Sequence, residues 1–217
     1  MNVIAVSGYK GSGKSTLCRT LISALTTRGF SVGYIKRTQE SVASPPDTDS
    51  GAANQLGVPS LLWGEESLRF ETLCGHAGEL DVRDLAGRYF PRADVVILEG
   101  GKYLRLPKIW VVKDGEDVPE SVGVFAVYDR HGPGDGGLVY GPGDIDRLVS
   151  DIADMTERYG SPARVYIDGY ELPMKDFVAS FLAGGVRGML ETLKNPSEQS
   201  VSGEIRLYLK ALRDREG

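Results

Sequence analysis

Eight consecutive residues near the N-terminus have the composition and spacing of a phosphate-binding loop. They run from Gly8 to Ser15 as Gly-Tyr-Lys-Gly-Ser-Gly-Lys-Ser, and they match the Walker A pattern G-x-x-x-x-G-K-S/T at every required position. Glycines let the backbone curl so that successive N–H groups point at an anion, and the N-terminus of the following helix adds its dipole. We expect Lys14 to reach the β- and γ-phosphates of a nucleoside triphosphate and Ser15 to bind Mg²⁺. The residues predicted to bind the nucleotide are Gly8, Gly11, Ser12, Gly13, Lys14, Ser15 and Thr16.

A chance match to a glycine-rich turn is the alternative interpretation of this loop. The context argues against it, because the apolar residues 3–6 predict a strand before the loop and residues 15–28 predict a helix after it. The loop therefore indicates a bound triphosphate with Mg²⁺, and it does not choose between ATP and GTP.

Glu99 is the second candidate for chemistry. It directly follows the apolar strand predicted over residues 93–98, and ligands of open α/β sheets bind at the C-terminal ends of the strands. An acid in that place can hold Mg²⁺ or one of its water ligands, as a Walker B acid does. A solvated carboxylate at a strand end is the plainer interpretation, and the nearby glycine loop makes us favour the metal-side role.

Asp49 is a weaker candidate, with Asp47 as its rival. Both lie in a polar, proline-containing segment after the second predicted strand, where a switch-like loop would meet the γ-phosphate. An aspartate in such a loop is more often solvated or caps a helix. The residues alone therefore favour a structural role for both.

Basic residues follow the second strand and Glu99. A rim of positive charge for an anionic second substrate is one interpretation, and an ordinary solvated surface is the other. The residues concerned are Lys36, Arg37, Lys102, Arg105 and Lys108.

The elements needed to position these residues are those of a parallel α/β domain. Residues 3–6, 15–28 and 31–36 predict a strand, a helix and a second strand, which is a βαβ unit with a right-handed crossover. We expect a three-layer P-loop fold with a mostly parallel sheet over residues 1–160. Further strands are predicted at 61–63, 68–73, 93–98, 109–112 and 122–128, and further helices at 49–56, 81–90 and 144–159.

The sequence changes in character after Gly160-Ser161-Pro162. A strand and turn at 164–172, an apolar helix at 177–193 and a strand at 204–209 predict a small α+β tail over residues 163–217. The Phe and Met residues of that helix are expected to belong to a core rather than to a ligand site.

Composition excludes several classes of protein. The net charge of −5 over 217 residues argues against nucleic-acid binding, which usually needs a basic surface. The two cysteines, Cys18 and Cys74, form no CxxC pair, so neither a disulfide framework nor a Cys/His metal centre is predicted. We find no signal peptide and no apolar run of membrane-spanning length, and we expect a cytoplasmic protein without membrane contact.

Read together, the motifs resemble the molybdopterin-guanine dinucleotide biosynthesis protein B (MobB) family. The resemblance covers residues 1 to about 130. The Walker A loop is common to a very large superfamily, so the more specific part is the later pair of motifs, Leu98-Glu99-Gly100-x-Lys102 and Pro107-Lys108-Ile109. The other shared features are Arg28-Gly29, Val32-Gly33-x-Ile35-Lys36, and Asp49-Ser50 before a short Ala-rich helix that ends at Gly57.

This resemblance implies a GTP-binding protein with weak GTP hydrolysis. It implies a homodimer that assists a molybdopterin nucleotidyltransferase, with GTP favoured over ATP. It also implies catalytic roles for Lys14, Asp49 and Glu99 and a magnesium site formed by Ser15, Asp49 and Glu99. Two features depart from the family: Arg37-Thr38 stands where members often carry His, and residues 163–217 lie beyond the family's shorter core.

Two other function classes stay open. A small-molecule or nucleotide kinase would need an arginine-bearing lid, for which Arg69, Arg83, Arg88 and Arg92 are the available residues. A nucleotide-switched adaptor would use the tail as its binding surface. Delivery of a metal would require a Cys/His cluster, which the sequence does not contain.

Overall fold

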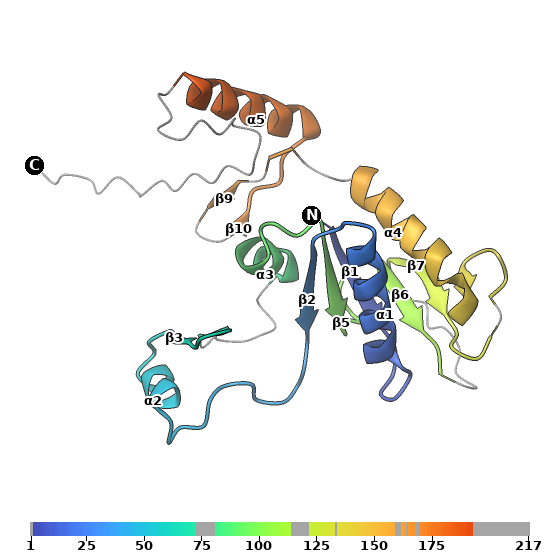
Figure 1. Cartoon of the computed structure of the whole chain (residues 1–217), viewed down its shortest axis with the longest axis horizontal. Helices are drawn as coiled ribbons and strands as arrows, with labels where there is room; N and C mark the ends of the chain where they lie inside the picture. Colours follow the sequence, from blue (N-terminus) through green and yellow to red (C-terminus); the bar gives the residue numbers. More distant parts are fainter. Residues whose placement is uncertain are drawn as a thin grey trace, which may run out of the picture. The chain divides into compact units, whose positions relative to one another are not determined.

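Six parallel strands form the central sheet of residues 1–160 (Figure 1). Their spatial order is β2-β5-β1-β6-β7-β8, and every neighbouring pair runs parallel. The predicted α/β class with a parallel sheet is therefore confirmed. The strands are β1 (Asn2–Ser7), β2 (Val32–Lys36), β5 (Val95–Glu99), β6 (Lys108–Val111), β7 (Val124–Tyr128) and β8 (Val139–Tyr140).

The structure is a computed structural model of the chain. It describes residues 2–72, 81–113, 122–132, 134–158, 162–163, 165–167 and 170–192. The chain divides into two compact units, residues 1–160 and 161–217. The strand expected at 204–209 lies outside the described residues, as do Leu73 and Leu193, the last residues of the strand expected at 68–73 and of the helix expected at 177–193.

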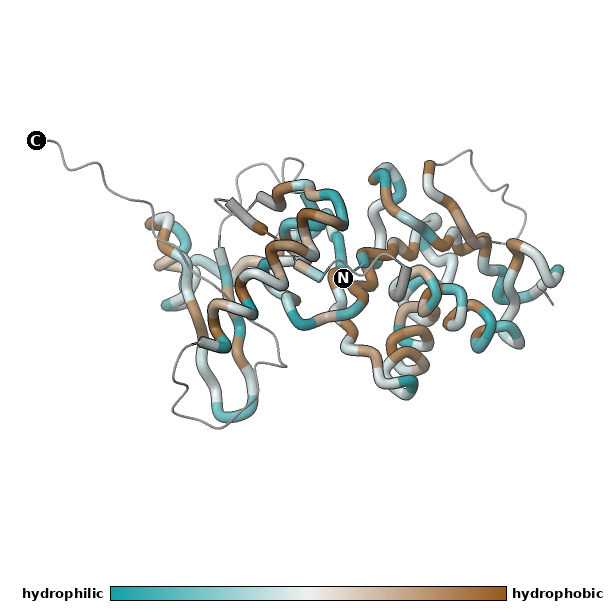
Figure 2. The backbone as a smooth tube through the Cα atoms, turned by 90° about the horizontal axis from the view of Figure 1, so that it is seen from above, coloured by the Kyte–Doolittle hydropathy of each residue, from teal (hydrophilic) through white to brown (hydrophobic). Residues whose placement is uncertain are grey.

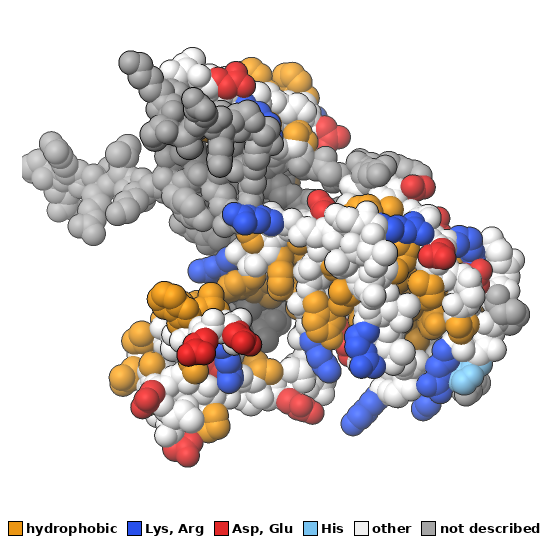
Figure 3. Space-filling view, in the orientation of Figure 1, with side chains coloured by type: hydrophobic (Ala, Val, Ile, Leu, Met, Phe, Trp, Pro, Cys, Tyr) orange, Lys and Arg blue, Asp and Glu red, His pale blue; other side chains and the backbone are white. Residues whose placement is uncertain are grey.

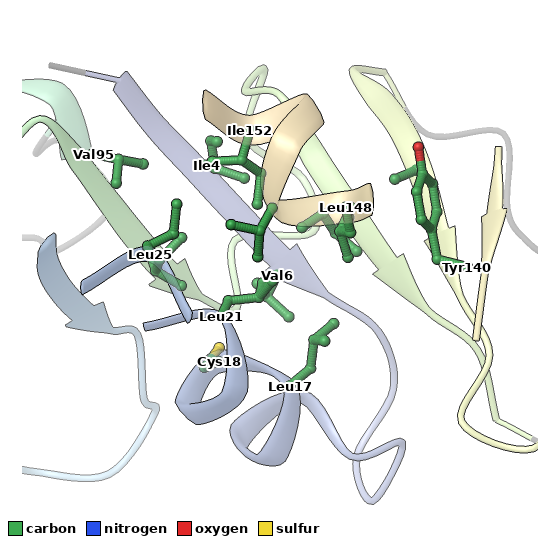
Figure 4. Packing of buried hydrophobic residues seen from close by; sticks show 14 of the residues in the cluster. Ile4, Val6, Leu17, Cys18, Leu21, Leu25, Val95, Tyr140, Leu148 and Ile152 are labelled. Atoms are coloured by element: carbon green, nitrogen blue, oxygen red, sulfur yellow. The ribbon is translucent and has the colours of Figure 1, made fainter. Parts of the chain in front are cut away.

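Helices cover both faces of the sheet. On one face α1 (Lys14–Thr27) and α4 (Ile145–Arg158) pack over β1, where Ile4 and Val6 meet Leu21 and Leu148 (Figure 4). On the other face α3 (Val82–Tyr89) covers the residues that alternate with them, including Val3, Ala5, Val96 and Leu98. A strand that is buried on both faces needs an unbroken apolar run, and the β1 and β5 sequences provide it.

The helices show the one-sided patterning that this packing requires. Figure 2 shows hydrophobic segments recurring along the helical turns between hydrophilic ones. In α1 the residues that turn toward the sheet are Leu17, Cys18, Leu21 and Leu25, which recur at helical spacing. Among the helices in the described ranges, none is long and apolar enough to cross a membrane.

Residues 49–71 form an arm that does not join the six-stranded sheet. It consists of α2 (Asp49–Gln55) and an antiparallel hairpin of β3 (Ser60–Trp63) and β4 (Leu68–Glu71) (Figure 1). The buried carboxylate of Glu71 holds the arm together, because it accepts hydrogen bonds from Asn54 Nδ2 at 3.0 Å and Ser44 Oγ at 2.8 Å. Arg69 forms an ion pair with the same carboxylate.

In the part of the second unit that the structure describes, there are a short antiparallel pair and one helix. The strands are β9 (Tyr166–Ile167) and β10 (Tyr170–Glu171), and the helix is α5 (Asp176–Glu191). The predicted strand-turn and apolar helix are therefore present. A 3₁₀ turn, η1 (Pro142–Asp144), completes the first unit by leading into α4.

Candidate nucleotide-binding site

The glycine loop connects the end of β1 to the start of α1, as the Walker A pattern predicts. Gly13 occupies the N-cap of α1 with φ of 97°, a left-handed conformation that suits glycine. Gly8 has φ of 151°, and a Cβ atom placed there would lie 2.4 Å from the carbonyl oxygen of Val111. Glycine is needed at residue 8 because the backbone of β6 leaves no space for a side chain.

The loop has the properties of an anion cradle. The hydroxyl of Ser12 is buried and has no hydrogen-bond partner within the described part of the chain. A buried polar atom without a partner is costly, and a bound phosphate oxygen in the loop would provide one. The residues present therefore fit the phosphates of a nucleotide.

Lys14 lies over its own loop. Its ammonium donates a hydrogen bond to the carbonyl oxygen of Tyr9 at 2.5 Å. Burial lowers the pKa of Lys14, and the negative charge of Glu99 acts in the opposite direction. A partly desolvated ammonium at the N-terminus of a helix is suited to pairing with phosphate oxygens.

Glu99 is the centre of a polar cluster beside this loop. Glu99 is buried, with 6% of the residue's surface exposed. Ser15 Oγ donates to Oε1 at 2.7 Å and Tyr34 Oη donates to Oε2 at 2.5 Å, while Lys36 Nζ lies 3.8 Å from Oε1. Burial by itself would raise the pKa of Glu99, but the two hydrogen bonds and the charges of Lys36 and Lys14 hold it below its usual value.

Strand register brings these groups together. Glu99 pairs with Val6 of β1 on one side and with Lys36 of β2 on the other, so three strands end at the same edge of the sheet. Ser7 Oγ adds a hydrogen bond of 2.7 Å to the carbonyl of Gly100, which fixes the chain that leaves β5. Lys and Arg side chains gather at this edge in Figure 3.

Asp49 is not part of this cluster. It is exposed in the first turn of α2, a helix that Thr48 caps by accepting a hydrogen bond from the N–H of Gly51. In the ranges that the structure covers, no hydrogen bond or ion pair joins Asp49 to Ser15 or Glu99, and no group of three or more His, Cys, Asp or Glu side chains is placed to hold a metal. The metal-side role of Asp49 stays a prediction.

The basic rim takes a different form from the one expected. Lys108 is buried, and its ammonium donates to the carbonyls of Lys102 and Leu104 at 2.8 and 2.9 Å. It therefore braces the segment after Glu99 instead of facing a substrate. Lys102 is closer to the glycine loop, with its ammonium 5.5 Å from the ring centre of Tyr9.

Tyr34 is the site residue that sequence reasoning missed. A tyrosine in a strand is ordinary, and the only signal is its spacing, since residues 34 and 36 share one face of β2. That spacing places the hydroxyl beside Glu99 once the order of the strands is known.

The arrangement can bind an anion in the glycine loop and a cation beside Ser15 and Glu99. Backbone N–H groups, the Lys14 ammonium and the helix dipole provide positive potential, and the ionised Glu99 provides the negative counterpart next to it. This combination is typical of sites for a nucleoside triphosphate with Mg²⁺.

Comparisons of the sequence and of the structure with known proteins both find members of one family. The family described as Molybdopterin guanine dinucleotide synthesis protein B (MobB) matches residues 3–127. The Escherichia coli (strain K12) protein named Molybdopterin-guanine dinucleotide biosynthesis adapter protein is 31% identical over 133 residues, which cover 59% of this chain and 74% of that protein.

Solved structures share the fold. A MobB homologue from Bacillus stearothermophilus has a TM-score of 0.53 at 25% identity, covering 73% of this chain and 99% of its own. Bacillus subtilis MobB, at 19% identity and a TM-score of 0.53, covers 69% of this chain and 97% of its own. With the family match spanning more than half of its residues, the chain belongs to the MobB family.

Proposed function

We propose that this protein binds GTP with Mg²⁺ and acts as an adapter in the biosynthesis of molybdopterin guanine dinucleotide. Family membership and the name of the Escherichia coli relative support the pathway. The observation that carries nucleotide binding is the hydrogen bond of 2.7 Å between Ser15, the last residue of the glycine loop, and Glu99. The preference for GTP over ATP follows from the family alone.

The proposed roles follow from the positions of the side chains. Loop amides and Lys14 hold the phosphates, with Gly8, Gly11, Ser12 and Gly13 shaping the cradle. Ser15 and Glu99 would hold Mg²⁺ directly or through water. When bound, this ion neutralises charge on the β- and γ-phosphates. Thr16, exposed in the first turn of α1, completes the predicted nucleotide-binding set.

Slow hydrolysis is the expected catalytic behaviour. A good general base has a pKa near the working pH, whereas the pKa of Glu99 is held below its usual value and both of its oxygens accept hydrogen bonds. Glu99 is therefore suited to holding a metal and poorly suited to activating water. We propose Asp49 as the second acid, a role that requires the arm of residues 49–71 to move toward the glycine loop.

A homodimer is part of the proposal, and the arm supports it. Leu61 pairs with Phe70 and Trp63 pairs with Leu68, which places all four side chains on one face of the hairpin. We call this face the hairpin patch. Its members are exposed, Trp63 at 86% and Leu68 at 65%, and the arm shows exposed hydrophobic groups in Figure 3.

A two-stranded hairpin is marginally stable by itself, and an exposed cluster of large apolar side chains usually marks an interface. We propose that the hairpin patch is covered by a second copy of this chain. A molybdopterin nucleotidyltransferase is the proposed partner of the dimer, and this partner follows from the family resemblance.

Calorimetric titration of Lys14→Ala tests the central claim. The variant should lose measurable GTP binding, because charge-assisted hydrogen bonds of this kind are worth about 1.5–3 kcal/mol each and Lys14 is expected to make more than one. Lys175→Ala is the matched control, since Lys175 is an exposed lysine of the second unit. Unchanged affinity in Lys14→Ala would exclude the glycine loop as the nucleotide site.

The same titration tests whether the site prefers guanine or adenine. GTP should bind at least about tenfold more tightly than ATP, a difference of about 1.4 kcal/mol. Equal affinities would remove the guanine preference and leave the phosphate site in place.

A further inference from the structure

Among the described residues, Tyr34 is the hydrogen-bond donor to the Glu99 carboxylate that lies outside the glycine loop and its helix. Its hydroxyl donates to Glu99 Oε2 at 2.5 Å, whereas Ser15 donates to Oε1 at 2.7 Å. The two carboxylate oxygens thus have separate donors from separate elements, α1 for Oε1 and β2 for Oε2. Tyr34 has no place in the Walker A pattern or in the predicted pair of acids.

The hydrogen bond of Ser15 fixes only one of the two carboxylate oxygens. A serine hydroxyl has one proton and two lone pairs, so Ser15 can bind Mg²⁺ through a lone pair while its proton stays on Glu99 Oε1. A carboxylate held at Oε1 alone would be free to rotate about that hydrogen bond. Tyr34 holds Oε2, and Lys36, at 3.8 Å from Oε1, is too distant for a hydrogen bond.

The phenol is well placed to stay in position. Tyr34 lies in a strand that pairs with β5 from Val95 to Glu99, so sheet hydrogen bonds fix the distance between the two backbones. Its side chain has only two rotatable bonds to the ring, and 39% of its surface is exposed. A phenol is protonated near neutral pH, so the hydroxyl of Tyr34 donates its hydrogen bond to Glu99 there.

We propose that Tyr34 is a positioning residue for the metal-side carboxylate: it holds Glu99 Oε2 so that Oε1 stays directed at the site of Mg²⁺ beside Ser15. This inference rests on the proposed function, because it concerns the same metal site. Its consequence is specific. Tyr34 should matter for Mg²⁺-dependent nucleotide binding and not for binding of the nucleotide without metal.

The experiment is a titration of GTP binding to the full chain at a series of Mg²⁺ concentrations, with a parallel series in EDTA. Tyr34→Phe removes only the hydroxyl. The Mg²⁺ concentration that gives half of the Mg²⁺-dependent increase in GTP affinity should rise about tenfold. This is the lower end of the effect of removing a hydrogen-bond partner of a metal ligand. Affinity in EDTA should be unchanged, whereas the melting temperature without nucleotide should fall slightly, because Glu99 loses a charge-assisted hydrogen bond. Tyr89→Phe, which removes a hydroxyl from α3, is the matched control.

A double-mutant cycle with Glu99→Gln tests whether Tyr34 acts through Glu99. Tyr34→Phe should have no further effect on the Mg²⁺ midpoint when Glu99 is already replaced, because the group that it positions is then neutral. Additive effects of the two substitutions would overturn the inference. An equal loss of GTP affinity with and without Mg²⁺ would also overturn it, since that result assigns Tyr34 to the shape of the site.

The outcomes separate this inference from the proposed function. Mg²⁺-dependent GTP binding by the wild type with an unchanged midpoint in Tyr34→Phe would overturn the role of Tyr34 alone. Failure of the wild type to bind GTP at any Mg²⁺ concentration would overturn the proposed function and, with it, the metal site that Tyr34 is proposed to serve.

Discussion

At the scale of single residues, Glu99 joins the glycine loop to the neighbouring strands. It accepts hydrogen bonds from Ser15 and Tyr34, and both Lys14 and Lys36 stabilise its charge. A carboxylate in such surroundings contributes to folding only while it is ionised. Its contribution therefore depends on pH in a direction that the structure defines.

The free energy of unfolding should show this dependence. The pKa of Glu99 in the folded protein lies below its ordinary value of 4.5, so the stabilisation is complete above that value and is lost as the pH falls through the folded-state pKa. The stability difference between the wild type and Glu99→Gln should stay constant from about pH 7.5 to 5.5 and shrink below about pH 4.5. Urea denaturation followed by circular dichroism at each pH measures it.

Glu40→Gln serves as the matched control, because Glu40 is exposed and lies outside this cluster. Subtracting each variant from the wild type removes the titration of the other carboxylates, which both proteins share. A difference for Glu99→Gln that grows as the pH falls would contradict the lowered pKa of Glu99.

Single residues also show where sequence reasoning ends. The place of Glu99 in the site was predictable, because an acidic residue directly after an apolar run lies at the C-terminal end of a parallel strand, where ligands bind. Lys108 was assigned to a rim or a solvated surface because lysine is almost never buried without partners. Its partners are the carbonyls of Lys102 and Leu104, and only the path of the folded segment brings them to the ammonium.

At the scale of elements, the loop between β1 and α1 is shaped by its contact with β6. Gly8 has φ of 151°, and an added Cβ would lie 2.4 Å from the oxygen of Val111 and 2.8 Å from Ser12 Oγ. The Val111 atom belongs to the backbone of a central strand, so it cannot move aside easily. Gly8 therefore links the conformation of the loop to the position of the sheet.

Gly8→Ala should weaken both folding and nucleotide binding. Backbone strain at such a residue is worth about 1–3 kcal/mol, and displacement of the loop from β6 adds to it. Thermal unfolding and GTP titration measure the two effects. Gly143→Ala is the control, because a Cβ at Gly143 meets no atom within 4 Å, and its stability should change by less than about 0.5 kcal/mol.

Elements of the sheet were predictable to different degrees. The βαβ unit at the N-terminus follows from apolar runs that stop at glycines, and the structure has it as β1, α1 and β2. Strands at 61–63 and 68–73 were expected without an assignment to a sheet, and they form a separate hairpin. The exposed apolar side chains of that hairpin look like core residues in sequence, so the pattern alone cannot show that the hairpin stays apart from the six-stranded sheet.

At the scale of the whole molecule, the family match and the structural unit end at different residues. The match covers residues 3–127, whereas the first unit continues to residue 160 because α4 completes the core on the α1 face of the sheet. Residues 161–217 form the second unit. The glycine loop with Glu99 and the hairpin patch both belong to the first unit but share no residue, so a substitution in the patch leaves these groups of the site in place.

Oligomeric state is the property that the hairpin patch should control. We expect the wild type to be a dimer in solution and Leu68→Asp to be a monomer, because the substitution places a charge opposite Trp63 within the patch. Loss of one central interface residue costs about 2 kcal/mol or more, which raises the dissociation constant about 30-fold. Size-exclusion chromatography with light scattering over a range of protein concentrations measures the change.

Leu138→Asp is the matched control, since Leu138 is an equally exposed leucine, at 66%, beyond the arm. It should remain a dimer, and Leu68→Asp should still bind GTP if assembly and nucleotide binding use separate surfaces. A wild type that is monomeric at every concentration would exclude the dimer. A Leu68→Asp variant as dimeric as the control would instead move the interface away from the hairpin, leaving the exposed apolar side chains of the arm to be covered by the proposed nucleotidyltransferase partner.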